Sequence, residues 1–162
     1  MDVSENRTSV TDDAGVAAFE SWFGEAEPQL RAALVATYGP ELGRDAAAEA
    51  LGHAWEHRHR VLEMSNPTGY VFRVGQRWAT RQERRNRRRF GLAPSGESSP
   101  GFEPALHDAL AGLPTRHRQV VVLCTGYGLT HRETADVLGI SPSTVQNHAE
   151  RGLRQLRRKV GQ

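Results

Sequence analysis

The chain has 162 residues, of which 38% are hydrophobic and 25% are charged. That length allows one ordinary domain or two small helical ones and argues against a large enzyme. No apolar run approaches the ~20 residues of a membrane span, and the acidic, polar start does not resemble a signal peptide, so we expect a cytoplasmic protein without a membrane span. The single cysteine, Cys124, excludes an internal disulfide and any multi-thiolate metal site within one chain. Because Cys124 follows three valines and a leucine in the sequence, we expect its thiol to be buried and inert.

The net charge of +2 conceals an uneven distribution along the chain. Residues 1–56 carry 11 acidic residues against 3 arginines, whereas residues 57–93 carry 10 arginines against 2 acidic residues. After an acidic stretch, residues 115–162 hold a second basic block with 8 basic residues against 3 acidic ones. Clustered positive charge neutralises phosphates and releases their counterions, so the two basic blocks predict two separate contacts with a polyanion.

The first third of the chain predicts two helices after a loose tail. Residues 1–14 are polar and show no apolar period, which is typical of a disordered tail. Apolar residues at helical spacing then predict a helix from Val16 to about Leu34. A second helix is expected from Pro40 to about Leu62, with Trp55 as its buried anchor.

A third helix and a linker complete the N-terminal half. Asn66-Pro67 is typical of an N-cap followed by proline at the first helical position, and the helix it opens should end near residue 89. On this helix we expect Tyr70 and Trp78 to face the core. Residues 91–105 contain three glycines, three prolines and three serines, which predicts a flexible linker.

The C-terminal part predicts a short helix before Pro114, another over residues 115–125, and two more between residues 129 and 160. Thr130 and Glu133 have the spacing of a capping box, and Ser141-Pro142 is a start signal for the last helix. No segment alternates polar and apolar residues long enough for a strand. The expected fold class is therefore all-α, with two small helical modules joined by a flexible linker.

The last two helices have the pattern of a helix-turn-helix. This motif needs a small residue where the helices cross, a glycine at the turn and branched apolar residues that lock the second helix, and Ala135, Gly139 and Val145 have that spacing. With Val145 inward, the remaining polar residues could read bases or hold phosphates in a major groove, although a solvated helix face fits each of them equally well. These residues are Ser143, Thr144, Gln146, Asn147, His148, Arg151, Arg154 and Arg158.

On these residues the chain resembles a known family. Residues 106–160, from Leu113-Pro114 through the helix-turn-helix, are similar to region four of bacterial sigma factors of the extracytoplasmic-function type. Upstream, residues 44–89 resemble region two of the same family. The resemblance implies a tail over 1–14, region two over 15–90, a linker over 91–105 and region four over 106–162. LuxR-type regulators share much of the helix-turn-helix but lack such an upstream module, and they are the alternative interpretation.

The resemblance implies a promoter-specificity subunit that binds RNA polymerase core and recognises and melts promoter DNA. It implies no cofactor, metal or catalysis of its own. An anti-sigma factor is a further candidate partner, whose existence the sequence leaves open. The positions that match the family's polymerase-binding residues are Asp45, Glu49, Gly52, His53 and Glu56. Capture of a flipped base of the minus-ten element falls to Met64, Ser65 and Asn66, and the basic helix that holds the displaced strand carries Arg73, Gln76, Arg77, Arg81, Arg84 and Arg85.

The chain also departs from the family's pattern, and one short motif suggests a different class of protein. The departures are Ala48, Arg77, Arg81, Gln146 and Glu150, so the promoter sequence cannot be transferred from a relative. His53-Ala54-Trp55-Glu56-His57 fits the H-x-x-E-H motif, in which two histidines bind zinc and the glutamate acts as a general base. Because neighbouring arginines would repel a cation, a zinc hydrolase is a remote alternative.

Overall fold

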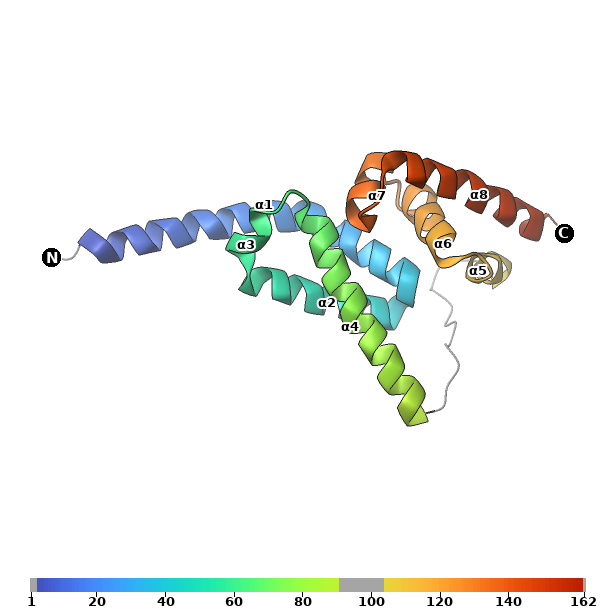
Figure 1. Ribbon diagram of the computed structural model, residues 1–162, viewed down its shortest axis with the longest axis horizontal. Coiled ribbons are helices and arrows are strands. Elements are labelled where there is room, and N and C mark those ends of the chain that lie inside the picture. Colours follow the sequence, from blue (N-terminus) through green and yellow to red (C-terminus); the bar gives the residue numbers. More distant parts are fainter. Residues whose placement is uncertain (1–2, 91–103, 162) are drawn as a thin grey trace.

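The computed structural model describes residues 3–90 and 104–161, and every regular element in these ranges is a helix (Figure 1), which confirms the all-α fold class. None of the described helices is both long and apolar enough to cross a membrane. Most of the expected linker lies outside the described residues, and its last two residues open a helix. The N-terminal module, residues 3–90, contains α1 (Val3–Tyr38), α2 (Pro40–Glu56), α3 (Arg58–Leu62) and α4 (Pro67–Phe90). The C-terminal module, residues 104–161, contains α5 (Pro104–Ala111), α6 (Thr115–Val121), the π-helical turn η1 (Val122–Gly126), α7 (His131–Leu138) and α8 (Pro142–Val160).

The N-terminal residues differ from the loose tail expected over residues 1–14. Helix α1 begins at Val3, and Figure 1 shows its first part projecting beyond the other helices. Neither glycine nor proline interrupts residues 3–14. Because adding residues to an existing helix is far easier than starting one, the buried part of α1 from Phe19 onward nucleates a helix that these residues extend.

Helices α1 and α2 pack at very short range. Gly39, with φ of 85°, ends α1 in a left-handed conformation that favours glycine, and Pro40 starts α2. At Gly43 a Cβ atom would lie 2.5 Å from the Cα atom of Val35, so only glycine fits there. The inner face of α2 is otherwise built from alanines: Ala46, Ala47, Ala50 and Ala54 are all buried.

This close packing explains why the expectation of Trp55 as a buried anchor is wrong. Trp55 is 43% exposed, since the face of α2 that meets its neighbours has room only for alanine and glycine. The large buried side chains of the module come from the other helices: Leu30 and Leu34 of α1, and Phe72 of α4, are each 1% exposed or less. Tyr70 and Trp78 are half-buried and pack against this core, near where we expected them.

In the C-terminal module the predicted helix-turn-helix is confirmed. Thr130 and Glu133 form the capping box at the start of α7: the Thr130 hydroxyl accepts from the Glu133 N–H at 3.2 Å, and the Glu133 carboxylate accepts from the Thr130 N–H at 2.7 Å. Gly139 ends α7 with φ of 65°. Ala135 and Val145 are buried at the crossing of α7 and α8, as their spacing predicts.

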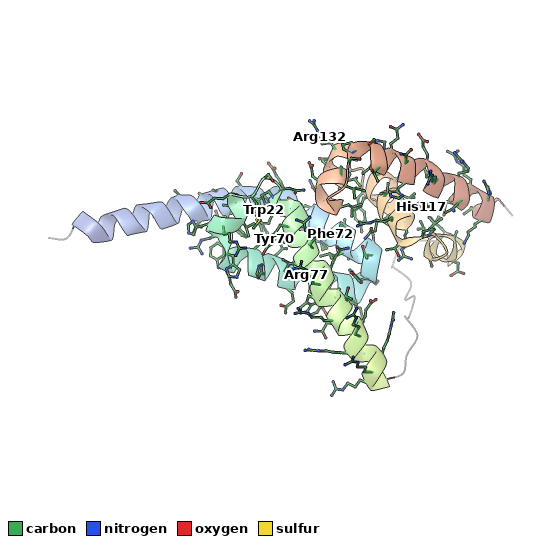
Figure 2. The ribbon with its side chains drawn as sticks, in the orientation of Figure 1. Trp22, Tyr70, Phe72, Arg77, His117 and Arg132 are labelled. Atoms are coloured by element: carbon green, nitrogen blue, oxygen red, sulfur yellow. The ribbon has the colours of Figure 1, made fainter. Side chains whose placement is uncertain are left out.

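The two modules also contact each other. Helix α1 packs against α6 and α7, and α4 packs against α7. Phe72, labelled in Figure 2, and Leu34 from the N-terminal module share one hydrophobic cluster with Val120 and Leu138 from the C-terminal module. In this arrangement the apolar cores of the two modules are continuous.

Candidate nucleic-acid interface

Helix α8 presents one polar face to solvent. The Ser141 hydroxyl caps it by accepting from the Thr144 N–H at 3.1 Å, and Pro142 occupies the first turn. Val145, Ala149 and Gly152 are buried and mark the inner face of the helix, and the positions opposite them face outward. Of the residues expected to bind DNA on this helix, the exposed ones are Ser143, Gln146, Asn147, Arg151, Arg154 and Arg158.

Two of the expected DNA-binding residues on α8, Thr144 and His148, are half-buried. The His148 ring lies against His117 of α6, with the ring centroids 5.2 Å apart. Desolvation, then the neighbouring His117 and the charges of Arg116 and Arg151, lower the pKa of His148 below its usual 6.5. The imidazole therefore sits in the contact between α6 and α8, unlike the outward-facing residues around it.

A side-chain pair on α8 limits how one residue can meet a base. The Gln146 Nε2 atom donates to the Glu150 carboxylate at 3.1 Å, one helical turn away. The Gln146 amide oxygen and the second carboxylate oxygen of Glu150 remain as acceptors, and one N–H of the Gln146 amide remains as a donor. The exposed surface at this point is thus rich in acceptors, which match the exocyclic amino groups of cytosine and adenine in a major groove.

Helix α4 carries the basic residues expected to hold a nucleic-acid strand. Figure 2 shows side chains fanning out from its second half, with Arg77 partway along. Arg73, Arg77 and Arg81 follow one another at four-residue steps and are exposed. They line an open groove together with Gln76, Thr80 and Arg84 of α4 and Tyr38 from the end of α1. Arg85 is exposed on the same helix beyond the groove. The expected basic residues therefore lie together on one helix.

The expected base-capture loop lies at the start of α4. Met64 is half-buried and Ser65 is exposed. The Asn66 Oδ1 atom accepts from the Gly69 N–H at 2.8 Å, which confirms the predicted N-cap. The Asn66 Nδ2 atom donates to the backbone oxygen of Asp136 in α7 at 2.7 Å. The loop thus meets the C-terminal module.

The five residues expected to bind polymerase lie together on the outer face of α2. Asp45, Glu49, Gly52, His53 and Glu56 line one open groove, whose other lining residues are Ala48 and Trp78. The sequence predicted Trp78 in the core, and no sequence signal indicated that it also lines this groove. Helix α4 therefore borders two grooves, since Trp78 lines the acidic one and its neighbours Arg77 and Arg81 line the basic one.

The H-x-x-E-H motif lies at the end of α2. The rings of His53 and His57 are 4.4 Å apart, and the His53 Nε2 atom lies 3.1 Å from the Tyr70 hydroxyl. Within residues 3–90 and 104–161, no group of three or more His, Cys, Asp or Glu side chains has the geometry to hold a metal ion. His53 instead connects α2 to α4 through Tyr70.

Comparison with known proteins bears on both modules. Residues 104–156, from the start of α5 to the last turns of α8, match the family model described as Sigma-70, region 4. The chain is also similar to a solved structure described as the sigma factor RpoE in complex with the anti-sigma factor NepR from Bartonella quintana. The TM-score is 0.64 at 19% sequence identity, and the match covers 88% of this chain and 96% of that chain. At this identity the match shows a shared fold, which extends over both helical modules.

Proposed function

We propose that the chain is a sigma factor of the extracytoplasmic-function type and that its two helical modules act on different parts of the promoter. A sigma factor binds RNA polymerase core and directs transcription initiation, and the family consists of transcription regulators. A LuxR-type regulator would account for the C-terminal module alone, whereas the likeness to a sigma factor covers 88% of the chain. The sigma interpretation is therefore favoured over the LuxR alternative.

In this proposal the N-terminal module acts as region two. The acidic groove of α2 binds polymerase core, and the basic groove of α4 holds the displaced strand at the minus-ten element. The observation that supports this best is that α4 borders both grooves. One rigid helix then fixes the distance between the polymerase contact and the DNA contact. Met64, Ser65 and Asn66, at the start of the same helix, take up the flipped base.

The C-terminal module acts as region four and reads the minus-thirty-five element with α8. Asn147 and Arg151 lie in the first half of the exposed face of α8 and would contact base edges. Arg154 and Arg158 lie further along the helix and would bind phosphates. Bond formation belongs to the polymerase, so we assign no catalytic step to this chain. In this proposal the chain acts in the cytoplasm, at the nucleoid. An anti-sigma factor is a candidate regulator, because the similar RpoE was solved with one.

Charge reversal on α2 tests the polymerase contact. Asp45→Arg combined with Glu49→Arg should weaken binding to purified core polymerase at least ~10-fold and abolish promoter-dependent transcription, because complementary charge is replaced by repulsion. Both side chains are exposed, so the fold should persist, as far-ultraviolet circular dichroism would verify. The matched control, Glu20→Arg with Glu25→Arg on the exposed face of α1, should bind as the unmodified chain does. Unchanged binding by the α2 variant would contradict the assignment.

A further inference from the structure

We propose that Tyr38, at the end of α1, is a residue on which one base of the displaced strand stacks when that strand lies in the basic groove of α4. The inference rests on the proposed function and adds to it a base contact from a different helix. Three observations support it: Tyr38 lines the groove, α4 holds its ring in place, and the arginines of the groove lie beside it.

The basic groove offers a single strand two kinds of surface. Helix α4 contributes four arginines, Gln76 and Thr80, and α1 contributes Tyr38. Among the described residues that line the groove, none is acidic and only Tyr38 is aromatic. Grooves that bind single strands combine positive charge along the path of the backbone with aromatic rings that stack on the bases. The arginines supply the charge, and Tyr38 supplies the ring.

The Tyr38 ring bridges α1 and α4. Its hydroxyl group donates to the Gln76 backbone oxygen at 3.3 Å and lies 3.3 Å from the Thr80 Oγ1 atom. Gln76 and Thr80 are one helical turn apart, so the hydroxyl group meets two successive turns of α4. Because the side chain starts on one helix and ends against the other, the half-buried ring lies across the groove between them.

The backbone at Tyr38 is fixed as well. Gly39 ends α1 with φ of 85°, and its N–H donates to the Val35 oxygen at 2.8 Å. The Gly39 oxygen in turn accepts from the Gly43 N–H at 2.9 Å, in the first turn of α2. Tyr38 therefore lies at a tight corner between two closely packed helices. A ring held at both ends loses little further freedom when a base stacks on it, which lowers the entropic cost of binding.

The arginines form a row beside the ring. Arg77 and Arg81 each follow one of the two residues that meet the Tyr38 hydroxyl group, which turns them by about 100° around α4. Both are exposed, and Figure 2 labels Arg77 on the outer side of the helix bundle. A strand whose phosphates contact this row can direct a base sideways onto the Tyr38 ring. The groove thus has a phosphate side and a base side.

Two substitutions separate stacking from a bond that only joins two helices. Tyr38→Phe removes the hydrogen bonds to Gln76 and Thr80 and retains the aromatic ring. Tyr38→Leu removes the aromatic face as well. A residue that stacks on a base loses most of its effect only in Tyr38→Leu, whereas a residue that acts through its hydroxyl group loses as much in Tyr38→Phe.

Binding of fork-shaped promoter fragments by the complex of core polymerase and this chain measures the difference. The displaced strand of each fragment is left single-stranded over the minus-ten element of a promoter identified by run-off transcription. Tyr38→Leu should weaken binding at least ~5-fold, and Tyr38→Phe should stay within about 2-fold of the unmodified chain. The matched control, Tyr127→Leu at a 54% exposed tyrosine of the C-terminal module, should change nothing. Equal losses in the two Tyr38 variants would overturn the inference.

A scan with abasic sites identifies the base concerned. Each nucleotide of the displaced strand loses its base in turn, and the effect of Tyr38→Leu is measured on every fragment. We expect one position, different from the base captured beside Asn66, at which Tyr38→Leu no longer weakens binding, because the contact is already absent. An equal effect of Tyr38→Leu on all fragments would assign the ring to packing alone and overturn the inference.

A second measurement keeps the test valid if Tyr38→Leu does not fold, as circular dichroism would show. The base analogue 2-aminopurine is quenched when it stacks and brightens when it is unstacked. In the complex of the unmodified chain, one unpaired position away from the captured base should stay quenched, and it should also stay quenched with Tyr38→Phe. Brightening at every unpaired position would contradict stacking on Tyr38.

The arginine row separates this inference from the proposed function. Arg77→Ala with Arg81→Ala should weaken fork binding and reduce its salt slope by about 1.4, whereas Tyr38→Leu should leave the slope unchanged. A loss in the arginine variant without one in Tyr38→Leu would overturn the inference and leave the proposed function intact. No loss in either variant would overturn the assignment of the groove to the displaced strand, and the stacking contact with it.

Discussion

The guanidinium of Arg58 lies over the ring of Trp55, with its central carbon 4.7 Å from the ring centroid. The same ring meets Phe19 edge-on, at a centroid distance of 5.3 Å, and remains 43% exposed. Trp55 therefore belongs to a surface cluster of aromatic and cationic side chains. A cation–π contact at such an exposed position contributes only about 0.5–1 kcal/mol.

This placement changes which aromatic residue should matter most for stability. We expect Phe72→Ala to lower the free energy of unfolding by about 3–5 kcal/mol, because Phe72 is 1% exposed and leaves a cavity. Trp55→Ala should cost less than ~2 kcal/mol, since much of its ring already contacts water. Urea denaturation followed by circular dichroism measures both. Equal losses would show that Trp55 is part of the core after all.

The capping box of α7 should give the helix-turn-helix a pH-dependent stability. Thr130→Ala should cost about 1 kcal/mol by removing an N-cap. Hydrogen bonds from the backbone and then the side chain of Thr130 lower the pKa of Glu133 below its usual 4.5. A carboxylate whose pKa is lower in the folded chain than in the unfolded chain stabilises the fold at pH values above its unfolded-state pKa. This contribution is lost as the pH falls through its folded-state pKa. The stability advantage over Glu133→Gln should thus be full above pH 4.5 and shrink below it, as thermal melts across this range would reveal.

The half-buried His148 should add a second pH dependence at higher pH. Its pKa is lowered, chiefly by desolvation and also by His117 and Arg116 of α6 and Arg151 of α8. The unfolded chain then binds the proton more readily, so this residue makes the fold less stable as the pH falls below 6.5. His148→Gln should reduce the loss of stability measured between about pH 7.5 and pH 5.5. The control, His131→Gln at the exposed start of α7, should leave that loss unchanged, and a similar effect of both substitutions would speak against this origin.

The proposed division of labour along α8 predicts two different effects of arginine removal. Arg151→Ala should cost ~1–3 kcal/mol at the cognate promoter and relax the preference at one base pair. Arg158→Ala should weaken all promoters alike and reduce the salt slope of binding by about one. Transcription of a randomised promoter library with each variant distinguishes them. A uniform loss with Arg151→Ala, leaving every base preference intact, would contradict base reading at this position.

The Gln146–Glu150 pair predicts which bases the upstream element contains. Since the pair presents acceptors, we expect cytosine or adenine at the base pair it meets. Glu150→Ala removes the carboxylate acceptors and frees both N–H groups of the Gln146 amide, so it should broaden the preference at that position. The same promoter library provides the measurement. An unaltered preference would mean that the pair faces solvent only.

Local signals in the sequence correctly predicted the starts of α4, α7 and α8. Asn66-Pro67, Thr130 with Glu133, and Ser141-Pro142 act within one helical turn, so the residues that form the signal also form the contact. The helix-turn-helix followed for the same reason, because Ala135, Gly139 and Val145 meet within one short motif. The family resemblance named the residues expected to bind polymerase, and their helical spacing predicts that they share one face of α2, whereas nothing in the sequence predicted that Trp78 lines the same groove.

Contacts between distant segments were beyond reach of the sequence. The apolar spacing of α2 identified a stripe but could not tell that α1 approaches at Gly43, which leaves room for alanines and moves Trp55 outward. The Arg118 side chain donates a hydrogen bond to the Ala36 oxygen at the end of α1, 82 positions earlier in the chain. Neither segment contains a sequence signal that predicts this contact. Likewise, His148 lies three residues after Val145, at the edge of the inner face of α8, and the sequence does not show that α6 covers it with His117.

The most direct test of the sigma assignment is run-off transcription from genomic DNA fragments with purified core polymerase, with and without this chain, followed by sequencing of the transcript starts. We predict new starts only when both components are present, each preceded by two shared sequence elements at a fixed spacing. Identical starts with and without the chain, or tight sequence-specific DNA binding by the chain alone that core polymerase does not alter, would contradict the account.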